Sequence, residues 1–267
     1  MEPAQPIAFD KITKSYTSDL RLKKSVALHE LSFSVKKGEV FGVVGPNGAG
    51  KSTALKILMG LVRPDSGTVT VSGSPAAEPA CHAKLGFLPE NPCLYERLTI
   101  REQLRFAASV ARMPAAAVGL RIEQLLQQVD LATAADTPIR NFSKGMTQRA
   151  ALAYALIHEP EILILDEPMS GLDPLGRKLV VDLIRAYHAK GNTILFSSHI
   201  LTDVERICDR IGIMNKGRLV ATIVPQDLQP VAADSGLPPS TTPLEAYFLR
   251  TIRDDHRLHP SATAQQP

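Results

Sequence analysis

One short stretch has the residue types and spacing that bind a phosphate group. It runs through Gly45, Pro46, Asn47, Gly48, Ala49, Gly50, Lys51, Ser52 and Thr53. This is the pattern of a phosphate-binding loop, whose glycines let backbone N–H groups converge on phosphate oxygens at a helix N-terminus. Lys51 would reach the β- and γ-phosphates of a nucleotide, and Ser52 would offer its hydroxyl to Mg²⁺. The stretch therefore predicts nucleotide binding.

Two adjacent carboxylates could supply the acid and base chemistry at such a site. Asp166 and Glu167 directly follow the apolar run Ile162–Leu165, and ligands of open α/β sheets bind where such buried strands end. We predict that Asp166 holds Mg²⁺ through water and that Glu167 orients or deprotonates the attacking water. His199 lies just past a second apolar run, where it could donate a hydrogen bond to a γ-phosphate.

Two further features are compatible with nucleotide contacts. Ser143 stands at a predicted helix N-cap, and Gly145 behind it permits close backbone approach. The positive charge of Lys144 in the first turn is unfavourable, because the N-terminal end of the helix dipole is also positive. A phosphate bound there would make this charge favourable. Tyr16 could stack on an adenine base or be an ordinary core tyrosine, and its spacing alone leaves both interpretations open.

The elements that must position these residues alternate between strand and helix. Glu39–Val44 reads as a buried strand before the phosphate loop, and Ala54–Met59 reads as the helix after it. The runs 162–165 and 193–197 are predicted central strands, with a helix over 179–189 between them. This alternation predicts a largely parallel sheet with right-handed crossovers.

Other segments depart from that pattern. Residues 7–9 and 31–35 alternate in polarity as antiparallel strands do, with Ser15–Thr17 and a basic run in the connection between them. Further strands are predicted over 67–73 and 85–88 and as a hairpin over 211–223. Apolar residues recur at helical spacing over 99–112, 116–130 and 143–158 with no strand signal between, which predicts an inserted helical block.

Composition restricts the class of protein. The chain has 267 residues, 44% apolar residues and a formal charge of +3, too small to imply a nucleic-acid partner. Cys81, Cys93 and Cys208 form no CxxC pair, which suits a reducing compartment better than a metal site. No apolar run reaches about 18 residues. We expect a cytoplasmic protein that would act at a membrane through a separate, spanning polypeptide.

The order of these motifs resembles the ATP-binding cassette (ABC) ATPases over roughly Ile7–Val224. Tyr16 resembles the adenine-stacking aromatic, and Gly45–Thr53 resembles the Walker A loop. Ser143–Thr147 is similar to the signature sequence, and Asp166 with Glu167 to the Walker B pair. Ser170–Asp173 and His199 resemble the D-loop and the switch histidine.

This resemblance implies a fold, a domain division and an assembly. The implied fold is a RecA-like P-loop core with an antiparallel β-subdomain and an inserted α-helical subdomain. The ATPase domain would cover residues 1–224, with the helical subdomain at about 95–158 and one short amphipathic helix in the tail 225–267. Two such domains would meet head to tail, each ATP lying between the phosphate loop of one and the signature of the other.

The chain departs from the usual family pattern at two places. Its signature reads Phe142, Ser143, Lys144, Gly145 and Met146 in place of Leu-Ser-Gly-Gly-Gln, a form similar to that of ABC-2-type exporters. Glu90 stands where the family has a glutamine. It could ligate Mg²⁺ or water through oxygen but could not donate an amide hydrogen bond.

The resemblance implies roles for named residues. The catalytic residues would be Glu167, His199 and Lys51. The residues contacting ATP would be Tyr16, Gly45–Thr53, Ser143, Lys144, Gly145, Met146 and Asp173. The Mg²⁺ ligands would be Ser52, Glu90 and Asp166.

Two functions from different classes are compatible with these features. The first is the ATPase subunit of an ABC-2-type exporter, which hydrolyses ATP as a dimer and docks on an integral membrane permease at the inner face of the cell membrane. The second is a soluble ABC switch acting on ribosomes or nucleic acid. Such switches carry two cassettes or a long coiled coil, which this sequence lacks, so no nucleic-acid partner is expected.

Overall fold

A six-stranded sheet forms the centre of the molecule, which a computed structural model describes over residues 5–17, 24–228, 238 and 241–258. Its strands are β3 (Val40–Val44), β6 (Leu85–Leu88), β7 (Ile162–Asp166), β8 (Thr193–Ser198), β9 (Arg210–Asn215) and β10 (Arg218–Ile223). They lie in the order β10-β9-β3-β8-β7-β6, and every neighbouring pair is parallel except β9 with β10. The predicted parallel core sheet is confirmed.

The central strands owe their position to their sequence. Every residue of β3, β7 and β8 is buried, as expected of continuous apolar runs covered on both faces. Because these strands are parallel neighbours, their carboxyl ends meet at one edge of the sheet. That edge carries the phosphate loop after β3, the two acids at the end of β7 and His199 just after β8.

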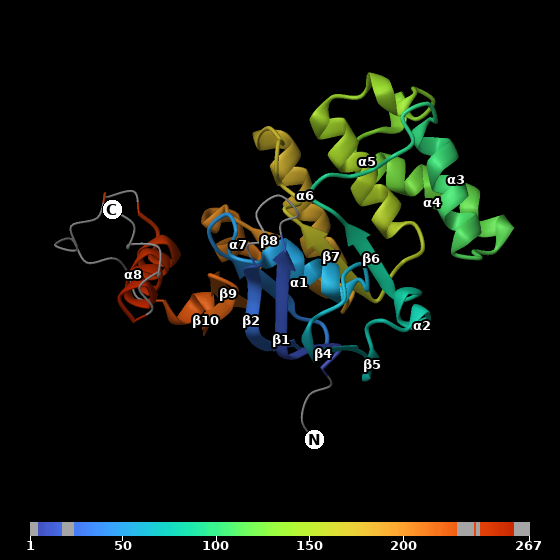
Figure 1. The fold of residues 1–267 in the computed structure, drawn as a ribbon. Coiled ribbons are helices and arrows are strands. Elements are labelled where there is room, and N and C mark those ends of the chain that lie inside the picture. Colours follow the sequence, from blue (N-terminus) through green and yellow to red (C-terminus); the bar gives the residue numbers. More distant parts are fainter. Residues whose placement is uncertain (1–4, 18–23, 229–237, 239–240, 259–267) are drawn as a thin grey trace.

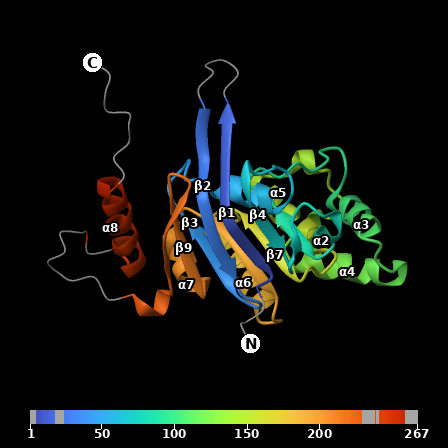
Figure 2. The same cartoon turned by 60° about the horizontal axis from the view of Figure 1, so that its bottom comes forward.

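A second, antiparallel sheet lies beside the first. Its strands are β1 (Ile7–Thr17), β2 (Lys24–Val35), β4 (Ser66–Val71) and β5 (Ser74–Pro75), in the order β2-β1-β4-β5. Figure 2 shows β1 and β2 projecting as a long hairpin. The expectation that Ser15–Thr17 connects two strands is wrong, because Tyr16 pairs with Ser25 within the β1–β2 ladder.

Three aromatic rings join the two sheets. Phe9 of β1 stacks on Phe33 of β2 with 4.4 Å between ring centroids. Phe33 in turn stacks on Phe41 of β3 at 5.3 Å. Stacked aromatic pairs at such distances add to the free energy of apolar burial. The antiparallel sheet is therefore held against the strand that leads into the phosphate loop.

The helices form two groups (Figure 1). Beside the sheets are α1 (Lys51–Leu58), α2 (Pro79–His82), α6 (Pro174–His188) and α7 (Leu201–Ile207). Gathered at one end are α3 (Ile100–Val110), α4 (Ala115–Gln128) and α5 (Lys144–Leu156). Single 3-10 turns occupy Ala132–Ala134, Ile139–Asn141 and Pro225–Asp227. The group of α3, α4 and α5 is the predicted helical block.

The last described helix, α8 (Pro243–Leu258), packs on the core. Leu244 is completely buried, and Phe248 and Ile252 pack against the same hydrophobic cluster, which matches the predicted apolar face. The helix contacts α7, β9 and β10 (Figure 1). Among the described residues, no helix combines the length and apolar character needed to cross a bilayer.

Candidate nucleotide-binding and catalytic site

The phosphate loop turns tightly between β3 and α1. Gly48 has φ of +79° and Gly50 has φ of +102°, a conformation that residues with a side chain rarely adopt. At Gly45, a Cβ atom would lie 2.4 Å from the carbonyl oxygen of Met214, so only glycine fits there. The loop thus brings backbone N–H groups to the N-terminus of α1, an arrangement that binds anions.

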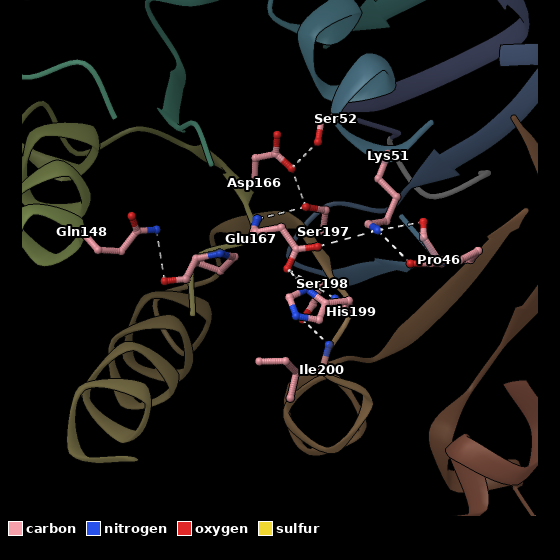
Figure 3. Close-up of polar contacts among 12 residues, drawn as sticks. Pro46, Lys51, Ser52, Gln148, Asp166, Glu167, Ser197, Ser198, His199 and Ile200 are labelled. Carbon is pink, nitrogen blue, oxygen red and sulfur yellow. Dashed lines mark hydrogen bonds and ion pairs between the residues drawn. The ribbon is translucent and has the colours of Figure 1, made fainter. Parts of the chain in front are cut away.

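Lys51 links this loop to the predicted base. Its side chain is 7% exposed, and its Nζ donates a 2.8 Å hydrogen bond to the carbonyl of Gly45. The same Nζ lies 3.7 Å from Oε1 of Glu167 (Figure 3). A buried ammonium group with a carboxylate so near is placed to exchange some of these partners for phosphate oxygens.

Ser197 of β8 holds both acids in place (Figure 3). Its completely buried Oγ donates a 2.6 Å hydrogen bond to Oδ1 of Asp166 and accepts a 3.0 Å bond from the backbone N–H of Glu167. Ser52 of α1 donates to the same Asp166 oxygen at 3.1 Å. Glu167 has φ of +50°, an uncommon value outside glycine. Its backbone is therefore held by contacts with β8.

His199 contacts the carboxylate of Glu167 from the other side. Its Nδ1 donates to Oε2 of Glu167 at 2.7 Å, and its backbone N–H lies 3.3 Å from the same oxygen. The His199 side chain is 53% exposed whereas that of Glu167 is 9% exposed. Glu167 thus lies between Lys51 and His199, which suits a base oriented by its neighbours.

Most of these predicted residues line one groove of about 520 Å³, whereas Gly45, Pro46 and Asp166 are not part of its lining. Its lining residues are Tyr16, Ser25, Val26, Ala27, Asn47, Gly48, Ala49, Gly50, Lys51, Ser52, Thr53, Glu90, Glu167 and His199. Tyr16 is 43% exposed, so it is not a core tyrosine. Lys14 lies with its Nζ 5.6 Å from the centroid of that ring and also pairs with Asp65 at 3.1 Å. One groove therefore contains both an exposed aromatic ring and the phosphate loop.

The signature residues lie elsewhere in the chain. Ser143, Lys144, Gly145, Met146 and Asp173 line a second depression of about 510 Å³. Ser143 caps α5 by accepting from the N–H of Met146, and Asp173 caps α6 by accepting from that of Gly176. Among the described residues, the two depressions share no lining residue. A single chain does not bring the signature to its own phosphate loop.

Comparison with known proteins identifies the family. Residues 28–170, more than half of the chain, match the family model described as ABC transporter. The chain belongs to the ABC transporter family. The matched segment contains the phosphate loop, the signature and both acids, so it is the ATP-binding ATPase domain of that family.

Individual relatives agree with this assignment. An uncharacterised ABC transporter ATP-binding protein of Nostoc sp. is 47% identical over 217 residues, covering 77% of this chain and 65% of the relative. A Nod factor export ATP-binding protein I of Burkholderia orbicola is 40% identical, with coverage of 84% and 72%. The chain thus spans slightly less than two thirds of the Nostoc relative.

A solved structure shares the whole fold. The structure of an ATP-binding subunit of an ABC transporter superposes with a TM-score of 0.79 at 32% identity. The superposition covers 92% of this chain and 99% of that one. The predicted fold class, a P-loop α/β core with an antiparallel sheet and added helices, is confirmed.

Two oxygen donors beside the phosphate loop of this ABC domain fit Mg²⁺. The Ser52 hydroxyl and the Asp166 carboxylate lie 3.1 Å apart beside the phosphate loop. Both are hard oxygen ligands, which Mg²⁺ prefers while keeping several waters or phosphate oxygens. In the described part of the chain, no three or more His, Cys, Asp or Glu side chains gather as a metal cage. A cation that takes most of its ligands from phosphate and water fits this donor set.

Two residues in this ABC domain escaped the sequence analysis. Ser197 lies in the strand before His199, where a polar side chain inside a buried apolar strand is a usable sequence signal. Gln148 of α5 is 3% exposed and donates a 3.3 Å hydrogen bond from Nε2 to the carbonyl of Pro168, directly after Glu167 (Figure 3). This bond joins the signature helix to the acids and has no local sequence signal.

Proposed function

We propose that two copies of this ABC domain bind ATP between them and hydrolyse it to drive export through a separate, ABC-2-type membrane permease. The separation of the two depressions is the observation that carries this proposal. The phosphate loop, Glu167 and His199 share one groove, whereas Ser143 and its neighbours face another. A second, inverted copy would place its signature helix N-terminus against the ATP of the first.

The residues of the chain have distinct tasks in this reaction. Lys51 and the loop N–H groups bind the β- and γ-phosphates, and Tyr16 stacks on adenine. Glu167 orients water and accepts its proton, while His199 holds the carboxylate and contacts the γ-phosphate. Mg²⁺, when bound by Ser52 and Asp166, neutralises phosphate charge. Glu90 lines the same groove and offers a further oxygen to the ion or its water.

The partner copy completes the site. Ser143, Gly145 and Met146 would present the N-terminus of α5 to the γ-phosphate, and Lys144 would bring a positive charge to it. Asp173 would lie in the D-loop close to the same interface. Loss of the γ-phosphate would remove these contacts and release the dimer.

An exposed aromatic pair supports docking on a permease. Tyr95 is 62% exposed and Phe106 is 49% exposed, and their rings meet edge to face with centroids 6.4 Å apart. They lie where the segment 90–98 joins the core to α3, so a partner at this surface would sense motion of the groove. Docking there would hold the protein at the cytoplasmic face of the cell membrane.

The residues of this site do not determine which cargo is exported. One relative is named for Nod factor export, but none of the residues described above would contact a cargo. In such systems specificity belongs to the membrane-spanning subunit. The proposal is therefore restricted to energising export.

The Glu167→Gln variant tests the reaction. It keeps the side-chain shape but loses the base, so it should bind ATP, accumulate as a dimer in light scattering and release almost no phosphate. Glu161→Gln is the matched control, because Glu161 pairs with Lys84 at the surface and lies outside the groove. Rapid phosphate release by Glu167→Gln would refute the assignment of the base.

Isolation from detergent extract tests the partner. Capture of the tagged chain should recover a small integral membrane protein, and Phe106→Ser should reduce that recovery without changing ATP binding. Recovery of ribosomal or nucleic-acid partners alone would favour the rival function, a soluble ABC switch.

A further inference from the structure

The helix α8 lies outside the region matched by the ABC family model and contacts the end of β9. Asp255 on this helix accepts a 2.7 Å hydrogen bond, through Oδ2, from Nδ2 of Asn215. Asn215 is 3% exposed and is the last residue of β9. A buried amide needs a partner, and Asp255 supplies one from 40 residues further along the chain.

Asn215 begins the tight turn between β9 and β10. Lys216 has φ of +45° and Gly217 has φ of +79°, the signs required by a two-residue turn of type I′. Such a conformation is strained for a residue with a side chain, so Lys216 needs support from its neighbours. The hydrogen bond from Asn215 to Asp255 fixes the residue on one side of the turn.

This turn contacts the phosphate loop and strand β2, both of which contribute residues to the nucleotide groove. The N–H of Gly217 donates a 3.0 Å hydrogen bond to the carbonyl of Ala49 in the phosphate loop. Its carbonyl accepts a 2.9 Å bond from the N–H of His29 in β2. A Cβ atom at Gly217 would lie 2.6 Å from the carbonyl of Ala27. Ala49 and Ala27 both line the groove.

We propose that Asp255 is a positioning residue, through which α8 holds the phosphate loop in register with β2, whose residues Ser25–Ala27 line the groove. Loss of its carboxylate leaves the Asn215 amide without this acceptor and lets the turn shift. Since Gly217 bonds to Ala49 and to His29, a shift of the turn changes the position of the phosphate loop relative to β2, which pairs with the Tyr16 end of β1. This inference rests on the proposed nucleotide groove and assigns α8 a role in affinity.

Three variants on α8 test the inference. Asp255→Ala removes the acceptor, and Asp255→Asn restores a neutral one. Asp254→Ala is the matched control, because Asp254 is a carboxylate on the same helix that forms an ion pair with the exposed Arg257, at 3.9 Å. The measurement is the Kd for MgADP by titration calorimetry on the full chain, with urea unfolding of each variant in parallel.

The expected result separates the three variants. Asp255→Ala should raise the Kd by about three- to tenfold, the effect of one lost hydrogen bond, whereas Asp255→Asn and Asp254→Ala should stay within about twofold of the parent protein. The inference is overturned if Asp255→Ala changes only the urea midpoint, or if Asp254→Ala weakens binding equally. Failure of the parent protein to bind MgADP would instead refute the proposal that this groove binds a nucleotide.

Discussion

Ser197→Ala should separate the role of a positioning hydroxyl from that of the acids it contacts. The substitution removes a single oxygen from a completely buried site on β8. That oxygen makes the 2.6 Å bond to Asp166 and accepts the 3.0 Å bond from the N–H of Glu167. No new volume is introduced, so the perturbation is confined to these two hydrogen bonds.

The magnitude follows from the kind of bond that is lost. A hydrogen bond to a charged group such as Asp166 contributes roughly 1.5 to 3 kcal/mol, and the buried N–H of Glu167 left unpaired costs about 1 to 3 kcal/mol. If a loss of about 1.4 to 2.8 kcal/mol falls on the transition state, kcat decreases by about 10- to 100-fold. Ser52 still donates to Asp166, so ATP binding should weaken less than turnover.

Steady-state release of phosphate, with ATP affinity measured separately, distinguishes these effects. Ser198→Ala is the matched control, since the Ser198 Oγ is a neighbouring, buried hydroxyl that accepts a 3.0 Å bond from Ile200 rather than contacting the acids (Figure 3). Equal kcat values for Ser197→Ala and Ser198→Ala, at equal loss of unfolding free energy, would refute the idea that Ser197 orients the acids.

Three other predictions each concern a single side chain. Lys51→Ala should raise the Kd for ATP in equilibrium titration by at least about tenfold, as lost charge-assisted phosphate contacts imply, and unchanged affinity would contradict its role. Tyr16→Ala should weaken binding of MgATP by about 0.5 to 1.5 kcal/mol, with no loss expected for inorganic triphosphate. Burial lowers the pKa of the His158 imidazole, whose Nε2 donates to the carbonyl of Leu85. The unfolded chain binds that proton near its ordinary pKa of about 6.5, so unfolding free energy should fall as the pH drops below that value, and His158→Gln should flatten this dependence in urea titrations.

Much of the fold was predictable because its signals are local. The apolar run before Asp166 is a buried strand, and the capped segment after Ser143 is a helix, as their periodicities indicate. Predicted bounds differ from the structure where the signal lies outside the apolar periodicity. The helix predicted over 179–189 begins at Pro174, where Asp173 caps it and proline occupies the first turn. These are ordinary helix-start signals.

Strand length depended on pairing rather than on composition. Ser15–Thr17 has little alternation to mark it as strand, yet β1 continues to Thr17 because β2 offers a hydrogen-bonding partner along its length. The same pairing leaves Tyr16 on the surface of the groove, which excludes the interpretation of Tyr16 as a core tyrosine.

The sequence by itself determined the chemistry of this ABC domain: a phosphate loop, two acids after a buried strand and a histidine after the next. These motifs are short, and their residue types and spacing follow from the atoms they must present to phosphate and water. Only the tertiary structure showed that Ser197 joins both acids, that the signature and the phosphate loop line separate depressions, and that Asp255 bonds to Asn215 at the turn that contacts Ala49. These arrangements depend on the order of the strands and the packing of the helices, and no local pattern of residues specifies either.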